Sequence, residues 1–176
     1  ATGDQQRAAL ASDGAGGAIV AWQDCRGIYY DIYAQRVTAG GEVEWTANGV
    51  PICTAAQGQG VAQVVSDGVG GAIIGWEDYR GADMDIYAQR VTHEGSVQWA
   101  TNGVPICFAS GNQWTCTLVP DGGSGAIIAW QDYRNGAADI YAQRVWANGT
   151  TPVLVSLVDV VVTVGRVEIT WSAAGG

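Results

Sequence analysis

The stretch Asp-Gly-Val-Gly-Gly-Ala-Ile-Ile-Gly-Trp-Glu-Asp-Tyr-Arg, residues 67–80, recurs with few changes at 13–26 and 121–134. The string Asp-Ile-Tyr-Ala-Gln-Arg-Val follows each copy, at 31–37, 85–91 and 139–145, and Asn-Gly-Val-Pro-Ile-Cys occurs at 48–53 and 102–107. The three copies are 54 residues apart, as Asp13, Asp67 and Asp121 show. Self-similarity at a fixed period of this length is typical of repeat architectures.

The period divides the 176-residue chain into a first repeat at 1–54, a second at 55–108 and a third at 109–150, followed by a C-terminal segment at 151–176. Four strands are expected in each repeat, and in the second they are Gly60–Ser66, Gly71–Glu77, Asp85–Thr92 and Ser96–Cys107. Glycine-rich turn signals separate these segments. The sequence therefore predicts an all-β protein.

The second strand of each repeat, such as Ala72 to Trp76, is apolar on both of its faces. Two-sided apolarity indicates a sheet that is covered on both sides, as the stacked four-stranded blades of a β-propeller are. The sequence favours a propeller-like repeat of three blades with open ends, because three blades are too few to close a ring. A β-trefoil, which also has three units of four strands, is the alternative.

The repeat string also resembles a known family. Asp-Gly-x-Gly-Gly-Ala-Ile-Ile-x-Trp-x-Asp-x-Arg followed by Asp-Ile-Tyr, over residues 12–37, 66–91 and 120–145, resembles the blades of TolB-like propellers and, more loosely, of sialidase-type propellers. The resemblance implies an extracellular or cell-surface location, as in bacterial secreted surface proteins, and it implies no particular chemistry.

The C-terminal segment has two interpretations. In one, Thr151–Val164 completes the third blade and Arg166–Trp171 begins a fourth. In the other, Val153–Trp171 is a β-hairpin that opens a further module, since Val-Glu-Ile-Thr-Trp-Ser-Ala-Ala at 167–174 resembles the second strand of immunoglobulin-like sorting domains. In both interpretations the chain leaves strand edges unpaired, and such edges template pairing with another chain.

Charge excludes one class of partner. The net charge is −9, and all eight basic residues are arginine. Nucleic-acid binding needs a basic surface that releases counterions, so no nucleic-acid partner is expected. No apolar run is long enough to span a membrane.

The four cysteines permit two disulfides, and the pairing expected from their positions is Cys25–Cys53 and Cys107–Cys116. Cys53 and Cys107 occupy equivalent positions in neighbouring repeats and should lie too far apart to be bridged. Four buried thiols are the alternative.

No catalytic residue is predicted. The one histidine, His93, lies in a hairpin turn, and His/Cys zinc spacing is absent. Asp24 and Asp31 recur in every repeat, as do two arginines, Arg26 and Arg36. A catalytic carboxylate pair normally breaks such symmetry, so these residues are interpreted as ion pairs and turn hydrogen bonds within each blade. No cofactor is expected, although Asp83 and Asp85 leave a calcium site open.

Two kinds of surface residue remain as candidates. Trp45 and Trp99 lie on the fourth strand, where exposure is expected, and a sugar could stack on Trp99 or Trp114. Asn148-Gly149-Thr150 is an N-glycosylation sequon on a hairpin turn.

These features favour a non-enzymatic extracellular structural protein that self-assembles through exposed strand edges, as a fibre or filament subunit does. The alternative is a glycan-binding propeller module with a polysaccharide partner. A fragment of a glycoside hydrolase is the third hypothesis.

Overall fold

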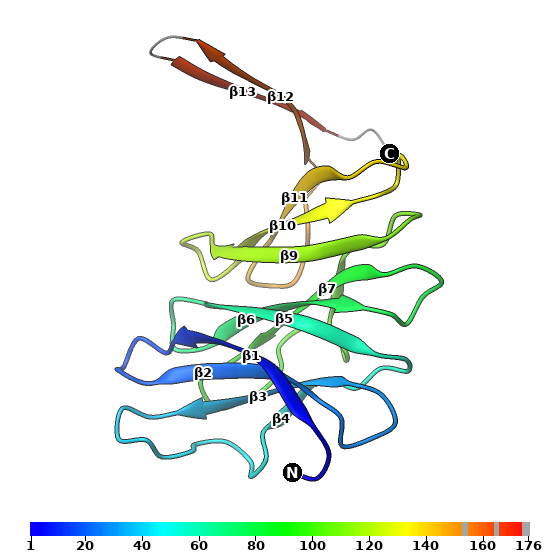
Figure 1. The fold of residues 1–176 in the computed structure, drawn as a ribbon. Helices are drawn as coiled ribbons and strands as arrows, with labels where there is room; N and C mark the ends of the chain where they lie inside the picture. The colour runs from blue at the N-terminus through cyan, green and yellow to red at the C-terminus, as the bar shows by residue number, and fades with distance from the viewer. Residues whose placement is uncertain (153–154, 164–165, 174–176) are drawn as a thin grey trace.

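The computed structural model describes residues 1–152 and, as backbone alone, 155–163 and 166–173. Each repeat forms its own antiparallel sheet, and the sheets stack along the molecule in chain order (Figure 1). This arrangement confirms the propeller-like fold with an unclosed stack. The trefoil alternative is wrong, because every ladder between the described strands lies within one repeat or its C-terminal extension.

The sheets are called blades 1, 2 and 3. Blade 1 contains β1 (Gln5–Ser12), β2 (Ala18–Asp24), β3 (Asp31–Val37) and β4 (Val50–Cys53). Blade 2 contains β5 (Gln59–Ser66), β6 (Ala72–Asp78), β7 (Asp85–Val91) and β8 (Val104–Cys107). Blade 3 contains β9 (Gln113–Pro120), β10 (Ala126–Asp132) and β11 (Asp139–Val145), to which β12 (Val155–Thr163) and β13 (Arg166–Ala173) are added.

The first three strands of blade 2 agree with the prediction, and the fourth begins later than expected. The segment from Ser96 to Gly103 forms an isolated bridge between Val97 and Val91 and then a turn, instead of a continuous strand. Asn102 and Gly103 at this turn both have positive φ, which ends the extended conformation. The strand β8 therefore contains only Val104–Cys107.

The C-terminal strands form the predicted hairpin. β12 pairs with β11 at Ala142↔Val155 and Tyr141↔Ser156, so it takes the place of a fourth strand in blade 3. β13 pairs antiparallel with β12 and extends the same sheet. The interpretation in which Arg166–Trp171 begins a separate fourth blade is wrong in this respect, because β13 belongs to the sheet of blade 3.

Each blade has two apolar faces, as the two-sided pattern predicts. The trailing face, directed at the next blade, is formed in blade 1 by Ile19, Ala21, Ile32 and Ala34. These side chains pack in one buried cluster with the leading face of blade 2, which is the face directed at the preceding blade. That leading face is formed by Ala62, Ala72, Ile74, Trp76 and Val91. A second cluster joins the trailing face of blade 2, including Ile73 and Ile86, to the leading face of blade 3, including Cys116, Leu118, Ile128 and Trp130. The core thus lies between the blades.

Candidate functional site

A cluster of tryptophan, aspartate and arginine recurs at the end of the second strand of each blade. In blade 2, Asp78 is fully buried and accepts hydrogen bonds from Trp76 Nε1 at 2.8 Å, from Arg80 Nε at 2.8 Å and from an Arg80 terminal nitrogen at 2.6 Å. The Arg80 guanidinium also lies 3.9 Å from the centre of the Tyr87 ring. Both sides of the carboxylate are thereby occupied, so the cluster holds the turn after β6 and leaves no free acid.

The same cluster forms at the equivalent positions of the other blades. Arg26 binds Asp24 and Arg134 binds Asp132, each at 2.6 Å. The hydrogen bonds from Arg26 hold the pKa of Asp24 below its usual value. Burial opposes ionisation of Asp132, yet hydrogen bonds from Arg134 and Trp130 outweigh it and lower that pKa as well. Both carboxylates are therefore ionised structural acceptors at neutral pH.

A second ion pair closes the first turn of each blade. Its aspartate, which precedes the second strand, is not predicted from the sequence as an arginine partner. Arg36 binds Asp13 at 2.9 Å, and Asp13 also accepts hydrogen bonds from the backbone of Ala15 and Gly17. The pairing recurs as Arg90–Asp67 and Arg144–Asp121. The expected participation of Asp31 in an ion pair within the blade is wrong: among the described residues Asp31 makes no salt bridge, since Arg36 is turned toward the opposite end of the sheet.

The carboxylates of Asp83 and Asp85 were the candidates for calcium. Asp83 accepts a hydrogen bond from the backbone of Gly111 at 2.9 Å, which ties blade 2 to blade 3. Within the described part of the chain, no group of three or more His, Cys, Asp or Glu residues is placed to hold a metal ion. Burial, with the neighbouring charges of Asp78 and Asp83, raises the pKa of Asp85 to about 6. The ionised Asp85 carboxylate therefore lowers the free energy of unfolding at neutral pH.

Replacing Asp85 by Asn should therefore stabilise the protein at pH 7.5. An aspartate in an unfolded chain titrates near 3.8, whereas folded Asp85 titrates at about 6. The folded state binds this proton more tightly, so the contribution of Asp85 favours folding below pH 3.8 and is lost as the pH rises through 6. We expect Asp85→Asn to raise the free energy of unfolding by about 1–3 kcal/mol at pH 7.5, and by far less at pH 4.

Urea unfolding at the two pH values measures this difference. Asp139, which occupies the same repeat position in blade 3 and is exposed, supplies the matched control Asp139→Asn. A gain of equal size for Asp85→Asn and Asp139→Asn would show that burial of Asp85 is not the cause.

The cysteines do not form the expected disulfides. All four are free thiols: Cys25 is partly buried, and Cys53, Cys107 and Cys116 are buried. The thiols of Cys53 and Cys107 face the following blade instead, where they accept hydrogen bonds from Arg80 at 3.2 Å and from Arg134 at 3.1 Å. Cys116 belongs to the leading face of blade 3, inside the core. The predicted pairings Cys25–Cys53 and Cys107–Cys116 are therefore wrong, and the alternative of buried thiols holds for three of the four cysteines.

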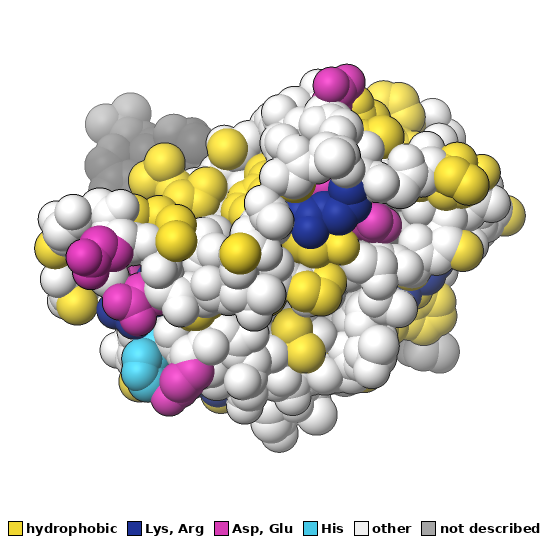
Figure 2. All heavy atoms as spheres, turned by 90° about the horizontal axis from the view of Figure 1, so that it is seen from below, with side chains coloured by type: hydrophobic (Ala, Val, Ile, Leu, Met, Phe, Trp, Pro, Cys, Tyr) yellow, Lys and Arg dark blue, Asp and Glu magenta, His cyan; other side chains and the backbone are white. Residues whose placement is uncertain are grey.

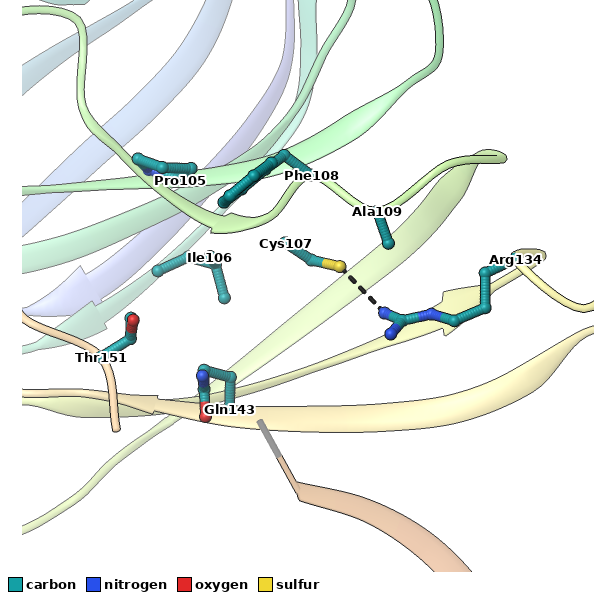
Figure 3. Close-up of a pocket in the computed structure, with 8 residues that line it drawn as sticks. All are labelled: Pro105, Ile106, Cys107, Phe108, Ala109, Arg134, Gln143 and Thr151. Carbon is teal, nitrogen blue, oxygen red and sulfur yellow. Dashed lines mark hydrogen bonds between the residues drawn. The ribbon is translucent and has the colours of Figure 1, made fainter. Parts of the chain in front are cut away.

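A half-open pocket of 310 Å³ lies beside one of these thiols (Figure 3). It is lined by Pro105, Ile106, Cys107, Phe108, Ala109, Arg134, Gln143 and Thr151. Burial raises the pKa of the Cys107 thiol to about 11, so it is neutral at pH 7 and a poor nucleophile. Arg134 is already bound to Asp132 and Cys107, and Gln143 donates to the carbonyl of Pro152 at 2.7 Å. Arg134 and the Gln143 side-chain nitrogen are thus held by contacts within the fold, while the buried Gln143 Oε1 accepts no hydrogen bond.

The predicted exposure of Trp45 and Trp99 is wrong. Trp99 is 8% exposed, and its Nε1 donates to the carbonyl of Ala147 at 3.0 Å. Its ring packs against Gly149 in the third turn of the next blade, and Trp45 packs in the same way against Gly95. These indoles anchor one blade on the next, so Trp99 offers no open ring face on which a sugar could stack.

Three other candidates are at the surface. Trp114 is 41% exposed and lies 5.7 Å from the Tyr133 ring, so sugar stacking there stays a prediction. Asn148 is exposed in a hairpin turn, where its Oδ1 accepts from the Thr150 hydroxyl at 2.8 Å. Its glycosylation also stays a prediction. His93 lies in the turn expected for it, 3.0 Å from Glu94.

Comparison with known proteins supports the fold. No family model matches the chain, and no curated protein matches it. A solved structure described by the words "The GH130 family of mannoside phosphorylases contains glycoside hydrolases that target beta-1,2 mannosidic linkages in Candida mannan" is similar, with a TM-score of 0.55 at 11% identity. The match covers 94% of this chain and 51% of that one, so the chain spans about half its length. At this identity the likeness shows a common propeller-like fold alone.

No helix in the described residues has the length and hydrophobicity needed to cross a membrane.

Proposed function

We propose that this chain is a non-enzymatic, extracellular structural protein that self-assembles through the ends of its blade stack. The observation that carries the proposal is the unclosed stack: among the described residues, blade 1 has a blade on one side only, and so does blade 3 (Figure 1). Propellers normally bury such faces by closing a ring of four to eight blades. An open stack of this kind gains stability when another blade covers its ends.

The chemistry of the blades supports a structural role. The carboxylates and guanidinium groups of the recurring clusters bind one another in every blade, as Asp78 binds Arg80 and Asp67 binds Arg90. A catalytic site uses one carboxylate differently from its equivalents, because acid and base need different pKa values. The extracellular assignment rests on the resemblance to secreted propellers and on the exposed sequon at Asn148.

Light scattering across a 100-fold dilution series, with negative-stain microscopy of the same samples, tests this function. The mass should exceed that of one chain and rise with concentration. It should also rise between about 10 and 150 mM salt, because screening weakens the repulsion between copies with a net charge of −9. A particle with the mass of one chain under all these conditions would refute self-assembly and leave glycan binding at Trp114 as the next hypothesis.

A further inference from the structure

The trailing face of blade 3 exposes residues that the other blades bury completely. Four isoleucines of the trailing faces of blades 1 and 2 are inaccessible to solvent: Ile19, Ile32, Ile73 and Ile86. Their equivalents in blade 3, Ile127 and Ile140, are 43% and 52% exposed. Since the residue type is the same at each position, the greater exposure of Ile127 and Ile140 follows from the lack of a described blade packed against them. The described side chains of blade 3 therefore present a surface already suited to another blade.

The leading face of blade 1 is open in the corresponding way. Leu10 is 69% exposed, whereas Leu118 at the same repeat position in blade 3 is 8% exposed. Trp22 is partly exposed, although its equivalents Trp76 and Trp130 are buried. Figure 2 views the molecule from the blade 1 end and shows hydrophobic side chains spread across it, with a basic group near the centre and acidic groups mostly toward the periphery. No blade among the described residues covers this end.

The interfaces inside the chain show how two such faces fit. Leu118 on the leading face of blade 3 packs directly over Gly75 on the trailing face of blade 2. Leu10 of blade 1 occupies the repeat position of Leu118. Ala129 of blade 3 occupies the repeat position of Gly75 and is also a small residue. The surface that would cover each end is therefore present at the other end of the same chain.

Backbone hydrogen bonds accompany this packing at both internal interfaces. Gln59 N donates to the carbonyl of Tyr30, and Gln113 N donates to that of Met84, each at 2.7 Å. The equivalent donor in blade 1 is the backbone of Gln5, and the equivalent acceptor in blade 3 is the carbonyl of Ala138. Backbone groups are the same in every residue except proline, so this pair is available between two copies whatever the side chains.

Pairing through the outer strand edges of blades 1 and 2 is less suitable. β4 and β8 are four residues long, and each contains a proline, Pro51 or Pro105, that has no N–H to donate. Short edge strands with proline are devices that prevent edge-to-edge pairing. The faces, by contrast, are broad and apolar. The open faces are thus a better route to assembly than the outer edges of blades 1 and 2, whereas the outer edge of the blade 3 sheet, β13, is eight residues long and contains no proline.

We infer that a second copy of this chain covers the open ends, with the trailing face of blade 3 in one copy seated on the leading face of blade 1 in the next. This inference rests on the proposed function and specifies its interface. The contact is head-to-tail, so it produces a closed ring or an open filament according to the rotation between copies. Two copies bring together six blades, a number within the range of closed propellers.

Two variants test the inference, one for each face. Leu10→Asp places a charge on the leading face, and the double variant Ile127→Asp, Ile140→Asp places charges on the trailing face. All three side chains are well exposed in one copy, so the fold should tolerate these changes. Because each variant would bury an unpaired carboxylate at the contact, we expect its apparent dissociation constant to rise about 100-fold or more.

A mixing experiment distinguishes head-to-tail contact from every symmetric one. Each variant retains one intact face, and the two intact faces are complementary. A 1:1 mixture of the two variants should therefore form pairs, measured by light scattering, that neither variant forms alone. The matched control is Ile28→Asp, since Ile28 is 89% exposed in a turn of blade 1. It should leave assembly unchanged.

The possible failures are separable. If the wild-type chain assembles but Leu10→Asp and the double variant assemble equally well, the face contact is overturned while self-assembly stands. If both variants dissociate but their mixture forms no pairs, the head-to-tail geometry is overturned. If the wild-type chain is monomeric at every concentration, the proposed function fails and this inference fails with it.

Discussion

Replacing Asp78 by Ala should lower the free energy of unfolding by about 3–5 kcal/mol, because it leaves a partly buried guanidinium and a buried indole N–H without their acceptor. Asp78 is fully buried and accepts from Trp76, from the backbone of Arg80 and twice from its guanidinium. The Arg80 side chain is 24% exposed, so solvent replaces the lost contact only in part. A small domain with a total stability of about 5–15 kcal/mol would lose a large share of it.

Urea unfolding followed by tryptophan fluorescence measures this loss. Asp78→Asn preserves the shape and one acceptor oxygen, so we expect a smaller loss than for Asp78→Ala. The matched control is Asp4→Ala, at an exposed position before β1. If Asp78→Ala unfolds within 1 kcal/mol of the wild-type protein, the cluster does not stabilise the blade in the way its geometry indicates.

The second large effect is expected at Gly103, in the turn before β8. Its φ is +86°, a conformation that costs any other residue about 1–2 kcal/mol. A Cβ at this position would also overlap the Trp76 ring and lie 2.7 Å from the carbonyl oxygen of Ala88. Neither neighbour has room to move, since Trp76 is in the core and Ala88 is in the β7 ladder. Gly103→Ala should thus cost about 3 kcal/mol or more, the sum of backbone strain and overpacking.

Gly68→Ala separates these two contributions. Gly68 has a φ of +77°, yet a Cβ there would have no atom within 4 Å. Its substitution should therefore cost only the backbone strain, about 1–2 kcal/mol. Thermal unfolding of both variants gives the comparison. Equal losses of stability at the two positions would mean that the close approach of Gly103 to Trp76 does not add to the cost of a Cβ at Gly103.

The sequence is sufficient to predict the first three strands of each blade, because the 54-residue period and the glycine-rich turns mark their ends in all three repeats. The two-sided apolar pattern around Ile73 and Ile74 is also sufficient to predict stacked sheets. The environment of residues whose partners lie in the next blade is harder to predict from the sequence. The pattern wrongly predicts an exposed Trp99, because the Trp99 ring packs against Gly149 of the next blade. A signal was present, since Trp45 and Gly95 recur at the same separation.

The predicted disulfides and the predicted ion pairing of Arg36 and Asp31 are wrong for a related reason. An even number of cysteines suggests disulfides, but the Cys53 thiol contacts Arg80, a residue of the following blade. Arg36 finds Asp13 because the register of β2 and β3 brings Arg36 opposite Ile19, near the turn that Asp13 closes. Pairing across a sheet depends on register, and register is fixed by the fold as a whole.

The matching of each trailing face to the next leading face also governs how such a chain can change length in evolution. Duplication of one whole 54-residue unit adds a blade whose two surfaces already fit those of its neighbours, so no compensating substitution is required. Loss of one unit has the same property in reverse. Insertion of part of a unit would place an apolar face against a polar turn. The number of blades is therefore free to vary among descendants of this sequence, while the length of the unit is held constant by the packing between sheets.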